Sequence, residues 1–152
     1  MTAVTNSNVI KEREERLKSE FSRFSNWEER YKHIIDLGKA LPPLPQELYD
    51  EKYKVRGCQS QVWLHAELTP EKKVRFKGDS DALIVKGLIA VLLNVYSDAT
   101  PEEILSSSPQ FLKDIGLEGH LSPSRANGLY AMVRQIHYYA KAFQALAALG
   151  RN

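Results

Sequence analysis

The chain has 152 residues, of which 43% are hydrophobic and 26% charged, the size and composition of one soluble globular domain with a buried core. Its 21 Lys and Arg nearly balance 19 Asp and Glu, so net charge does not indicate nucleic acid or an anionic membrane as partner. The N-terminus lacks a signal-peptide core, and the most hydrophobic segment, residues 82–95, is too short to span a membrane. We therefore expect a cytoplasmic protein.

The first two predicted elements are helices. Residues 9–21 are rich in Lys, Glu and Arg with scattered apolar side chains, which predicts a largely solvated helix that is only loosely attached. Asn26 and Glu29 have the spacing of a helix cap, and apolar residues then recur at helical intervals. This second helix ends before Pro42.

A predicted hairpin follows an irregular stretch. Residues 42–57 contain three prolines and mixed charges, which favours a surface loop. Apolar and polar residues alternate over residues 62–68, a turn follows at residues 69–73, and a second strand passes through Val74 and Phe76. We expect these two strands to pair antiparallel.

The rest of the chain reads as helices. Ser80 is predicted to cap a buried helix over residues 81–96, which is apolar on nearly every side. Three later helices have a cap residue followed by proline, at Thr100, Ser108 and Ser122. The last of them runs to about Leu149. The order of elements predicts an α+β fold, a small antiparallel sheet with the hairpin at its centre, packed against several helices.

The only cysteine, Cys58, lies between the irregular loop and the first strand. Free cysteines are usually buried and inert. Three neighbours argue for reactivity: Gly57 lets the backbone turn, Gln59 begins a polar stretch, and Arg56 is a cation that would favour the thiolate. From these residues alone, a reactive and a structural cysteine are about equally supported.

A single cysteine excludes an internal disulfide and a metal site made of several thiolates of this chain. A cysteine hydrolase would need a histidine base beside the sulfur. The four histidines have no spacing that marks such a base or a metal site: His33, His65, His120 and His137. The sequence leaves open whether folding brings one of these histidines close to the Cys58 sulfur. The chemistry that needs no further group is sulfur exchange, in which a thiolate attacks a sulfur of another molecule.

Four segments carry a family resemblance: Asn26–Tyr31, Val55–Trp63, Phe76–Ala82 with Ile84–Leu88, and Leu121–Leu129. They span residues 20–145 and resemble, in the same order, the SufE-type sulfur acceptors that partner cysteine desulfurases in iron–sulfur cluster assembly. The resemblance implies a SufE/IscU-like fold over residues 21–150, with residues 1–20 as a charged helical extension. The metal-binding cysteines of the IscU-like scaffolds are absent.

The resemblance also implies a function. A SufS-like cysteine desulfurase would hold sulfur as a persulfide, and Cys58 would accept it and pass it to a scaffold such as SufBCD. Pyridoxal phosphate would belong to the desulfurase, so we expect no cofactor or metal in this chain. The alternative is a docking-only activator of the desulfurase in which Cys58 is structural.

Five other residues are expected around the acceptor cysteine, in partner docking or in stabilising the sulfur: Arg56, Gly57, Gln59, Asp81 and Arg125. Asp81 and Arg125 match family residues implicated there, and Asp81 is expected in the first turn of the buried helix. Because an exposed persulfide is easily reduced or oxidised, we expect Cys58 to rest against apolar surface, and the loop of residues 50–60 to swing outward on docking.

Overall fold

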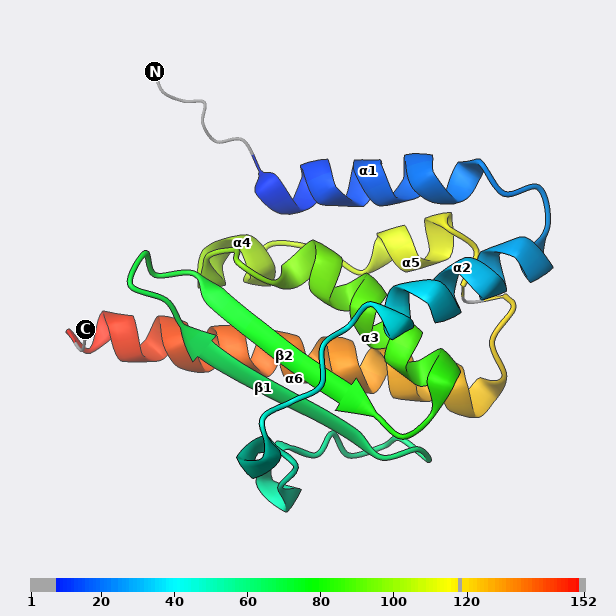
Figure 1. The fold of residues 1–152 in the computed structure, drawn as a ribbon. Helices are drawn as coiled ribbons and strands as arrows, with labels where there is room; N and C mark the ends of the chain where they lie inside the picture. Colours follow the sequence, from blue (N-terminus) through cyan, green and yellow to red (C-terminus); the bar gives the residue numbers. More distant parts are fainter. Residues whose placement is uncertain (1–7, 118, 151–152) are drawn as a thin grey trace.

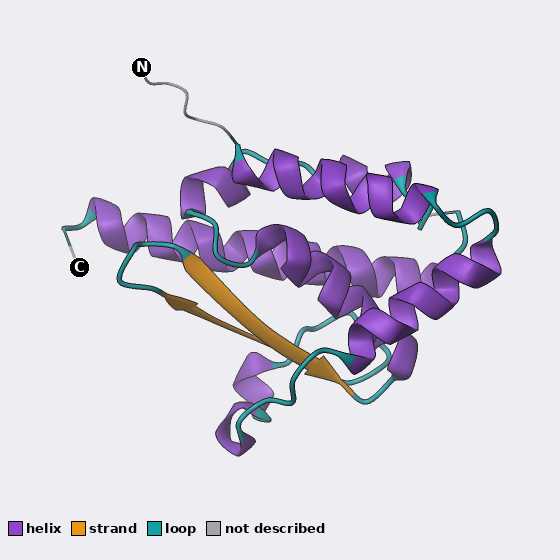
Figure 2. Cartoon of the chain, turned by 45° about the horizontal axis from the view of Figure 1, so that its top comes forward, coloured by secondary structure: helices purple, strands orange, loops and turns teal. Residues whose placement is uncertain are grey.

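A two-stranded antiparallel sheet with helices packed against it forms the fold, in a computed structural model that describes residues 8–117 and 119–150 (Figure 1). The helices are α1 (Val9–Ser22), α2 (Trp27–Lys39), α3 (Leu83–Tyr96), α4 (Pro101–Leu105), α5 (Gln110–Asp114) and α6 (Pro123–Ala148). The strands are β1 (Val62–Leu68) and β2 (Val74–Ser80), and the short 3-10 helices η1 (Gln46–Leu48) and η2 (Glu51–Tyr53) precede them. The turned view shows the strands to one side of the helices (Figure 2).

The predicted hairpin is confirmed. Val62 pairs with Ser80 and Leu68 with Val74, and buried residues alternate with more exposed ones from Val62 to Leu64 and from Val74 to Gly78. A single bridge adds to each edge of the hairpin, Lys54 to Trp63 and Val74 to Ala99. The hairpin therefore forms the centre of a small sheet, and the predicted α+β class is confirmed.

Helix α3 is the buried centre of the molecule, and α2 crosses it at unusually short range. A Cβ added to Gly38 would lie 2.6 Å from the backbone nitrogen of Gly87, and one added to Gly87 would lie 2.2 Å from the carbonyl oxygen of Ile34. Only glycine at both positions lets the two backbones approach this closely. This contact fixes the position of α3. Helix α3 in turn supports the hairpin and the loop that carries Cys58, called the cysteine loop below.

The N-terminal helix α1 belongs to the core. Its apolar stripe is fully buried, through Ile10, Leu17 and Phe21. The Arg13 guanidinium donates hydrogen bonds to the carbonyls of Val95, Ser97 and Asp98 at the end of α3, at 3.0, 2.5 and 3.1 Å. The expected loose attachment is wrong, because a few apolar residues on one face outweigh the charges on the other. Since α1 continues to Ser22, the boundary expected at residue 20 falls inside it.

The start of α3 differs from the prediction. Ser80 is the last residue of β2, and Ala82 occupies the N-cap position without a side-chain cap. The Ser80 hydroxyl instead accepts a hydrogen bond from the Ala82 amide at 3.2 Å. Asp81 therefore precedes the helix and does not lie in its first turn, because pairing with β1 extends β2 to Ser80.

The caps of the other helices follow the sequence more closely. The side chains of Asn26, Thr100 and Ser122 each accept a hydrogen bond from the first turn of their helix. Helix α5 begins at Gln110, one residue after Pro109, and the Ser108 hydroxyl accepts from the Gln110 amide at 3.2 Å. Local hydrogen-bonding chemistry therefore sets these boundaries.

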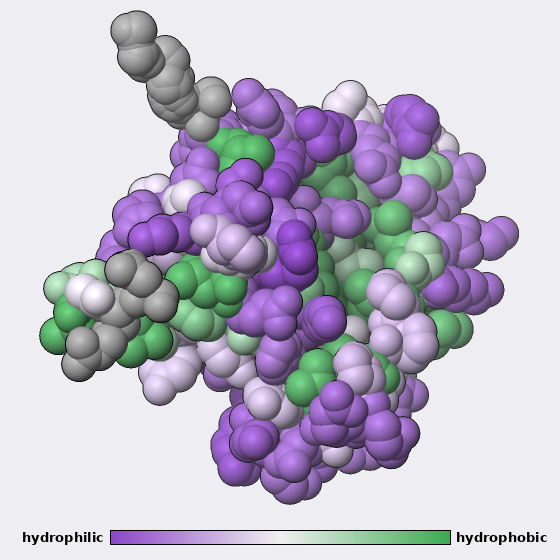
Figure 3. Space-filling model, turned by 60° about the vertical axis from the view of Figure 1, so that its left-hand side comes forward, coloured by the Kyte–Doolittle hydropathy of each residue, from purple (hydrophilic) through white to green (hydrophobic). Residues whose placement is uncertain are grey.

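Helix α6 is the longest element and lies along the hairpin and α3 (Figure 1). The Tyr139 hydroxyl donates to the carbonyl of Leu64 in β1 at 2.9 Å, which ties the helix to the sheet. Its last turns leave the core, with Leu146 48% and Leu149 68% exposed, and Figure 3 shows hydrophobic residues gathered near that end. Within the described ranges, no helix is long and apolar enough to cross a membrane.

We expect Gly87→Ala to lower the free energy of unfolding by about 1–3 kcal/mol, because the added Cβ would clash with the Ile34 carbonyl. The gain in helix propensity, about 1 kcal/mol at most, opposes this loss without removing it. Urea unfolding followed by circular dichroism measures the difference. Gly119→Ala is the control, since nothing lies within 4 Å of a Cβ at that position. Equal unfolding midpoints for the two variants would contradict the close crossing.

Candidate functional site

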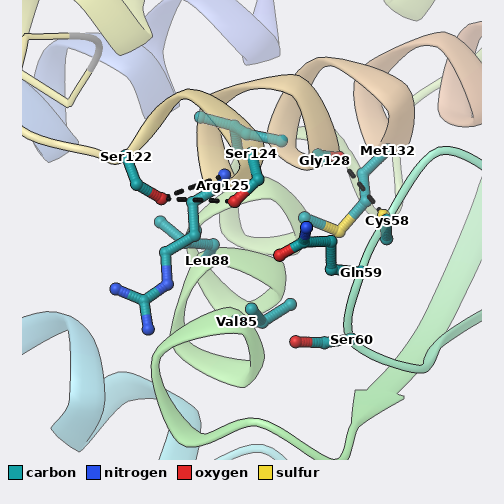
Figure 4. A pocket seen from close by; sticks show the side chains of 11 residues that line it. Cys58, Gln59, Ser60, Val85, Leu88, Ser122, Ser124, Arg125, Gly128 and Met132 are labelled. Carbon is teal, nitrogen blue, oxygen red and sulfur yellow. Dashed lines mark hydrogen bonds between the residues drawn. The ribbon is translucent and has the colours of Figure 1, made fainter.

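The Cys58 loop lies on the first half of α6 with very little space between them. Gly57 has a φ of +94°, a conformation that side-chain-bearing residues rarely adopt, and it turns the chain toward the helix. The Cys58 thiol donates to the carbonyl of Gly128 at 3.6 Å (Figure 4). A Cβ on Gly128 would lie 3.3 Å from the Cys58 sulfur. The glycine in α6 thus makes room for the cysteine.

A pocket of about 330 Å³ opens beside the cysteine. Its apolar wall comes from α3 and α6, through Val85, Leu88, Leu129 and Met132. Its polar wall comes from the cysteine loop and the start of α6, through Gln59, Ser60, Ser122, Ser124 and Arg125. Cys58 and Arg125 lie at opposite ends of this pocket (Figure 4). The thiol is therefore accessible from a small cavity with two chemically different walls.

The environment of Cys58 favours the neutral thiol. The residue is half-buried, and burial raises the pKa of its thiol, because a thiolate loses solvation there. The positive charge of Arg134 acts in the opposite direction. Arg56 is exposed and does not line the pocket, so its expected role in stabilising the thiolate stays a prediction. Sequence proximity suggested Arg56, whereas packing of the loop on α6 supplies Arg134.

The structure brings together only some of the residues expected at the site. Gln59 and Arg125 line the pocket with Cys58, and Gly57 directs the loop onto α6. Asp81 lies outside the pocket, where its carboxylate accepts hydrogen bonds from the backbone and side-chain nitrogens of Gln61 at 2.9 and 3.4 Å. The Asp81 amide donates back to the Gln61 carbonyl at 3.3 Å. Asp81 therefore anchors the end of the cysteine loop.

A second anchor, which the sequence did not indicate, holds the chain at Tyr49, before the cysteine loop. The Tyr49 hydroxyl donates to the Asp79 carboxylate at 2.5 Å and accepts from the Leu44 amide at 3.1 Å. Asp79 is only 8% exposed, and the Lys86 ammonium lies 3.4 Å from it. Asp79 and Asp81 lie at and just after the end of β2, so this short stretch binds the chain both before the cysteine loop, at Tyr49, and at its end, at Gln61.

Other residues at the site were also not found from the sequence. Gly128 and Met132 contact or line the cysteine pocket from α6, and Arg134 acts on the thiolate. The spacing of buried residues along the last helix could have placed Gly128 and Met132 on its inner face. It could not have shown that the cysteine loop covers that face.

The structure does not support a cysteine hydrolase. None of the four histidines, all of them described, lines the pocket. Their contacts lie elsewhere: His33 with Glu20, His65 with Tyr53, His120 with Trp27, and His137 with Ser107 and Val133. A base for proton transfer would have to lie within hydrogen-bond reach of the sulfur. Among the described residues, no group of three or more His, Cys, Asp or Glu is placed to hold a metal ion.

The fold and the site define an α+β domain with one half-buried thiol on a loop over a pocket. The family described as "SufE: Fe-S metabolism associated domain" matches residues 15–140. The chain belongs to the SufE family, which confirms the resemblance and associates it with iron–sulfur metabolism.

A solved structure has the same fold. It is the solution structure of a hypothetical protein from Thermus thermophilus, and it superposes with a TM-score of 0.74 at 24% sequence identity. The match covers 88% of this chain and 96% of that chain. At this identity the likeness supports the fold alone.

We expect Arg134→Gln to slow the alkylation of Cys58 by iodoacetamide below the thiol pKa, because loss of the cation raises that pKa further. At pH high enough to ionise the thiol fully, the rates of variant and wild type should converge. Arg56→Gln removes an exposed charge from the loop that carries Cys58, and its alkylation rate should follow that of the wild type at each pH. Mass spectrometry of the intact protein over a pH series measures the rates. A slower Arg56→Gln beside an unchanged Arg134→Gln would contradict this assignment.

Proposed function

We propose that this protein is a sulfur carrier that accepts persulfide sulfur from a cysteine desulfurase onto Cys58 and passes it to an iron–sulfur cluster assembly scaffold. The observation that carries the proposal is the position of Cys58, which follows a turn of the chain and lines one end of a pocket, in a domain of the SufE family. The proposal places the protein in the cytoplasm, with a SufS-like donor and a SufBCD-like acceptor.

The transfer step needs only a thiolate and a persulfide. The Cys58 thiolate attacks the outer sulfur of the desulfurase persulfide and forms a new sulfur–sulfur bond. The bond between the two desulfurase sulfurs breaks, and the desulfurase cysteine leaves as a thiolate. Cys58 is then the persulfide. Pyridoxal phosphate acts earlier, within the desulfurase, and this chain contributes no cofactor to the step.

Half-burial of Cys58 fits a carrier that must keep its sulfur between partners. Burial disfavours the thiolate, so the free protein would react slowly with reductants and oxidants in solution. Transfer would then require a partner that exposes the thiol and supplies a favourable charge. This division of roles agrees with the lack of a histidine beside the sulfur among the described residues.

The face around the loop offers a surface for such a partner. Arg56, Gly57, Gln59, Asp81 and Arg125 are all exposed. Close to Asp81 in the chain, Leu83 is 53% exposed, the kind of apolar side chain that docking would cover. We assign docking to this face, and we propose that Arg125, which lines the pocket at the end away from Cys58, contributes positive charge that would favour an anionic sulfur there.

One observation favours the docking-only alternative. The raised pKa and the hydrogen bond to Gly128 are also what a structural cysteine would show. In that case the protein would stimulate the desulfurase by binding it, without carrying sulfur. The following experiment separates the two functions.

After incubation with a cysteine desulfurase and cysteine, the wild-type protein should gain the mass of one sulfur atom, and Cys58→Ser should gain none. Non-reducing mass spectrometry of the intact protein and its peptides measures the addition. Stimulation of cysteine turnover by Cys58→Ala should be lost if Cys58 carries sulfur. Full stimulation by Cys58→Ala would favour the docking-only function, and equal masses for wild type and Cys58→Ser would contradict the carrier.

Amide exchange in residues 56–61 should rise when the desulfurase binds, because the loop must leave α6 for Cys58 to reach a partner. In the free protein, Asp81→Ala should also raise exchange at Gln61, since its carboxylate accepts that amide at 2.9 Å. Asp81→Asn retains an acceptor oxygen and serves as the control. Hydrogen–deuterium exchange with mass spectrometry measures both effects. Unchanged loop exchange in the complex would contradict the outward movement.

A further inference from the structure

The pocket beside Cys58 has the size of a small-molecule site. Its volume of about 330 Å³ lies at the lower end of the range for pockets that bind small ligands. The thiol is at one end and the Arg125 side chain at the other (Figure 4). An occupant that reaches from Arg125 to the sulfur would therefore be a short chain.

The charges around this pocket favour an anion. Arg125 lines it, and the Arg125 guanidinium has no hydrogen-bond or ion-pair partner among the described residues. Arg134 adds a second positive charge that acts on the sulfur. No Asp or Glu is among the lining residues, and the Asp81 carboxylate is bonded to Gln61 outside the pocket. An acidic group on the ligand would meet the Arg125 guanidinium without a competing carboxylate among the lining residues.

The pocket walls between Cys58 and Arg125 suit the middle part of such a ligand. Val85, Leu88 and Met132 offer apolar surface to methylene groups. Opposite them, the Gln59 side chain points into the pocket and has no hydrogen-bond partner among the described residues (Figure 4). A short aliphatic chain with a carboxylate at one end and a sulfur at the other fits this arrangement.

We propose that this pocket binds small carboxylate-bearing disulfides and that Cys58 forms mixed disulfides with them. The Cys58 thiol first releases its proton to water. Its thiolate then attacks the nearer sulfur of the bound disulfide, so that a bond from Cys58 to that sulfur forms as the disulfide bond of the ligand breaks. Cys58 is oxidised, and the other half of the ligand is reduced, leaves as a thiolate and takes a proton from water. No protein partner takes part, so this inference stands apart from sulfur transfer.

Three disulfides of similar length test it: dithiodipropionate with two carboxylates, neutral hydroxyethyl disulfide, and cystamine with two amines. Intact-protein mass spectrometry gives the rate of mixed-disulfide formation on Cys58 for each. Dividing by the hydroxyethyl disulfide rate removes any change in thiol reactivity. In Arg125→Gln we expect the normalised dithiodipropionate rate to fall about two- to fivefold, the range for one exposed ion pair, and the cystamine rate to rise.

Two further variants separate a local contact from overall charge. Arg125→Lys keeps the cation and should retain most of the preference for dithiodipropionate. Arg16→Gln removes the same charge from the exposed face of α1, away from the pocket lining, and should leave the normalised rates unchanged. Unchanged normalised rates in Arg125→Gln, or an equal fall in Arg16→Gln, would overturn the inference. Because no desulfurase is present, neither result bears on the sulfur-carrier proposal.

Discussion

The close crossing of α2 and α3 at Gly38 and Gly87 is the contact on which the rest of the structure depends. It positions α3 at the centre of the molecule, under β2 and beside α6. The face of α3 toward the cysteine loop then supplies Val85 and Leu88 to the cysteine pocket, and the turn that leads into α3 carries Asp81. A side chain at either glycine would separate the helices and shift both the wall of the pocket and the anchor of the loop.

At Cys58 the structure balances protection against reactivity. The same packing that shields the sulfur, against Gly128, also raises its pKa. A nucleophile in an enzyme complete in itself usually has the opposite environment, with a lowered pKa and a base at hand. An incomplete site of this kind suits a protein whose chemistry is finished by a partner, and the exposed residues around the loop are where that partner would contribute.

Local rules predicted most elements of the fold. Alternation in β1 and β2 and the caps at Asn26, Thr100 and Ser122 act between near neighbours in the chain, so they can be read from the sequence. The attachment of α1 to the core could not be predicted from the sequence. It depends on carbonyls at the far end of α3, which Arg13 reaches only in the folded chain. The sequence of a charge-rich helix with a narrow apolar stripe is the same whether or not the rest of the chain offers a surface for that stripe to pack on.

The residues of the candidate site also fall into those that local sequence predicts and those that only the folded chain brings together. Cys58 and its turn at Gly57 are local features and were found, and the family motifs added Arg125. Gly128 and Arg134 were not found, because they become neighbours of the cysteine only when the loop packs on α6. Asp81 was found but misplaced, since the pairing of β2 with β1 delays the start of α3 beyond it.

The two anchors of the cysteine loop have a mechanical consequence. Tyr49 is bound to the Asp79 carboxylate and Gln61 to the Asp81 carboxylate, so residues 49–61 are held at both ends by side chains of one short stretch of the chain. Between them, the Val55 amide donates to the Val62 carbonyl at 2.9 Å and the Val55 side chain is buried in the core, so only residues 56–60 can move without breaking these contacts. Cys58 lies in the middle of this short span, so the length of the span sets how far the sulfur can travel from α6, and a change in residues 56–60 would leave the core unaltered.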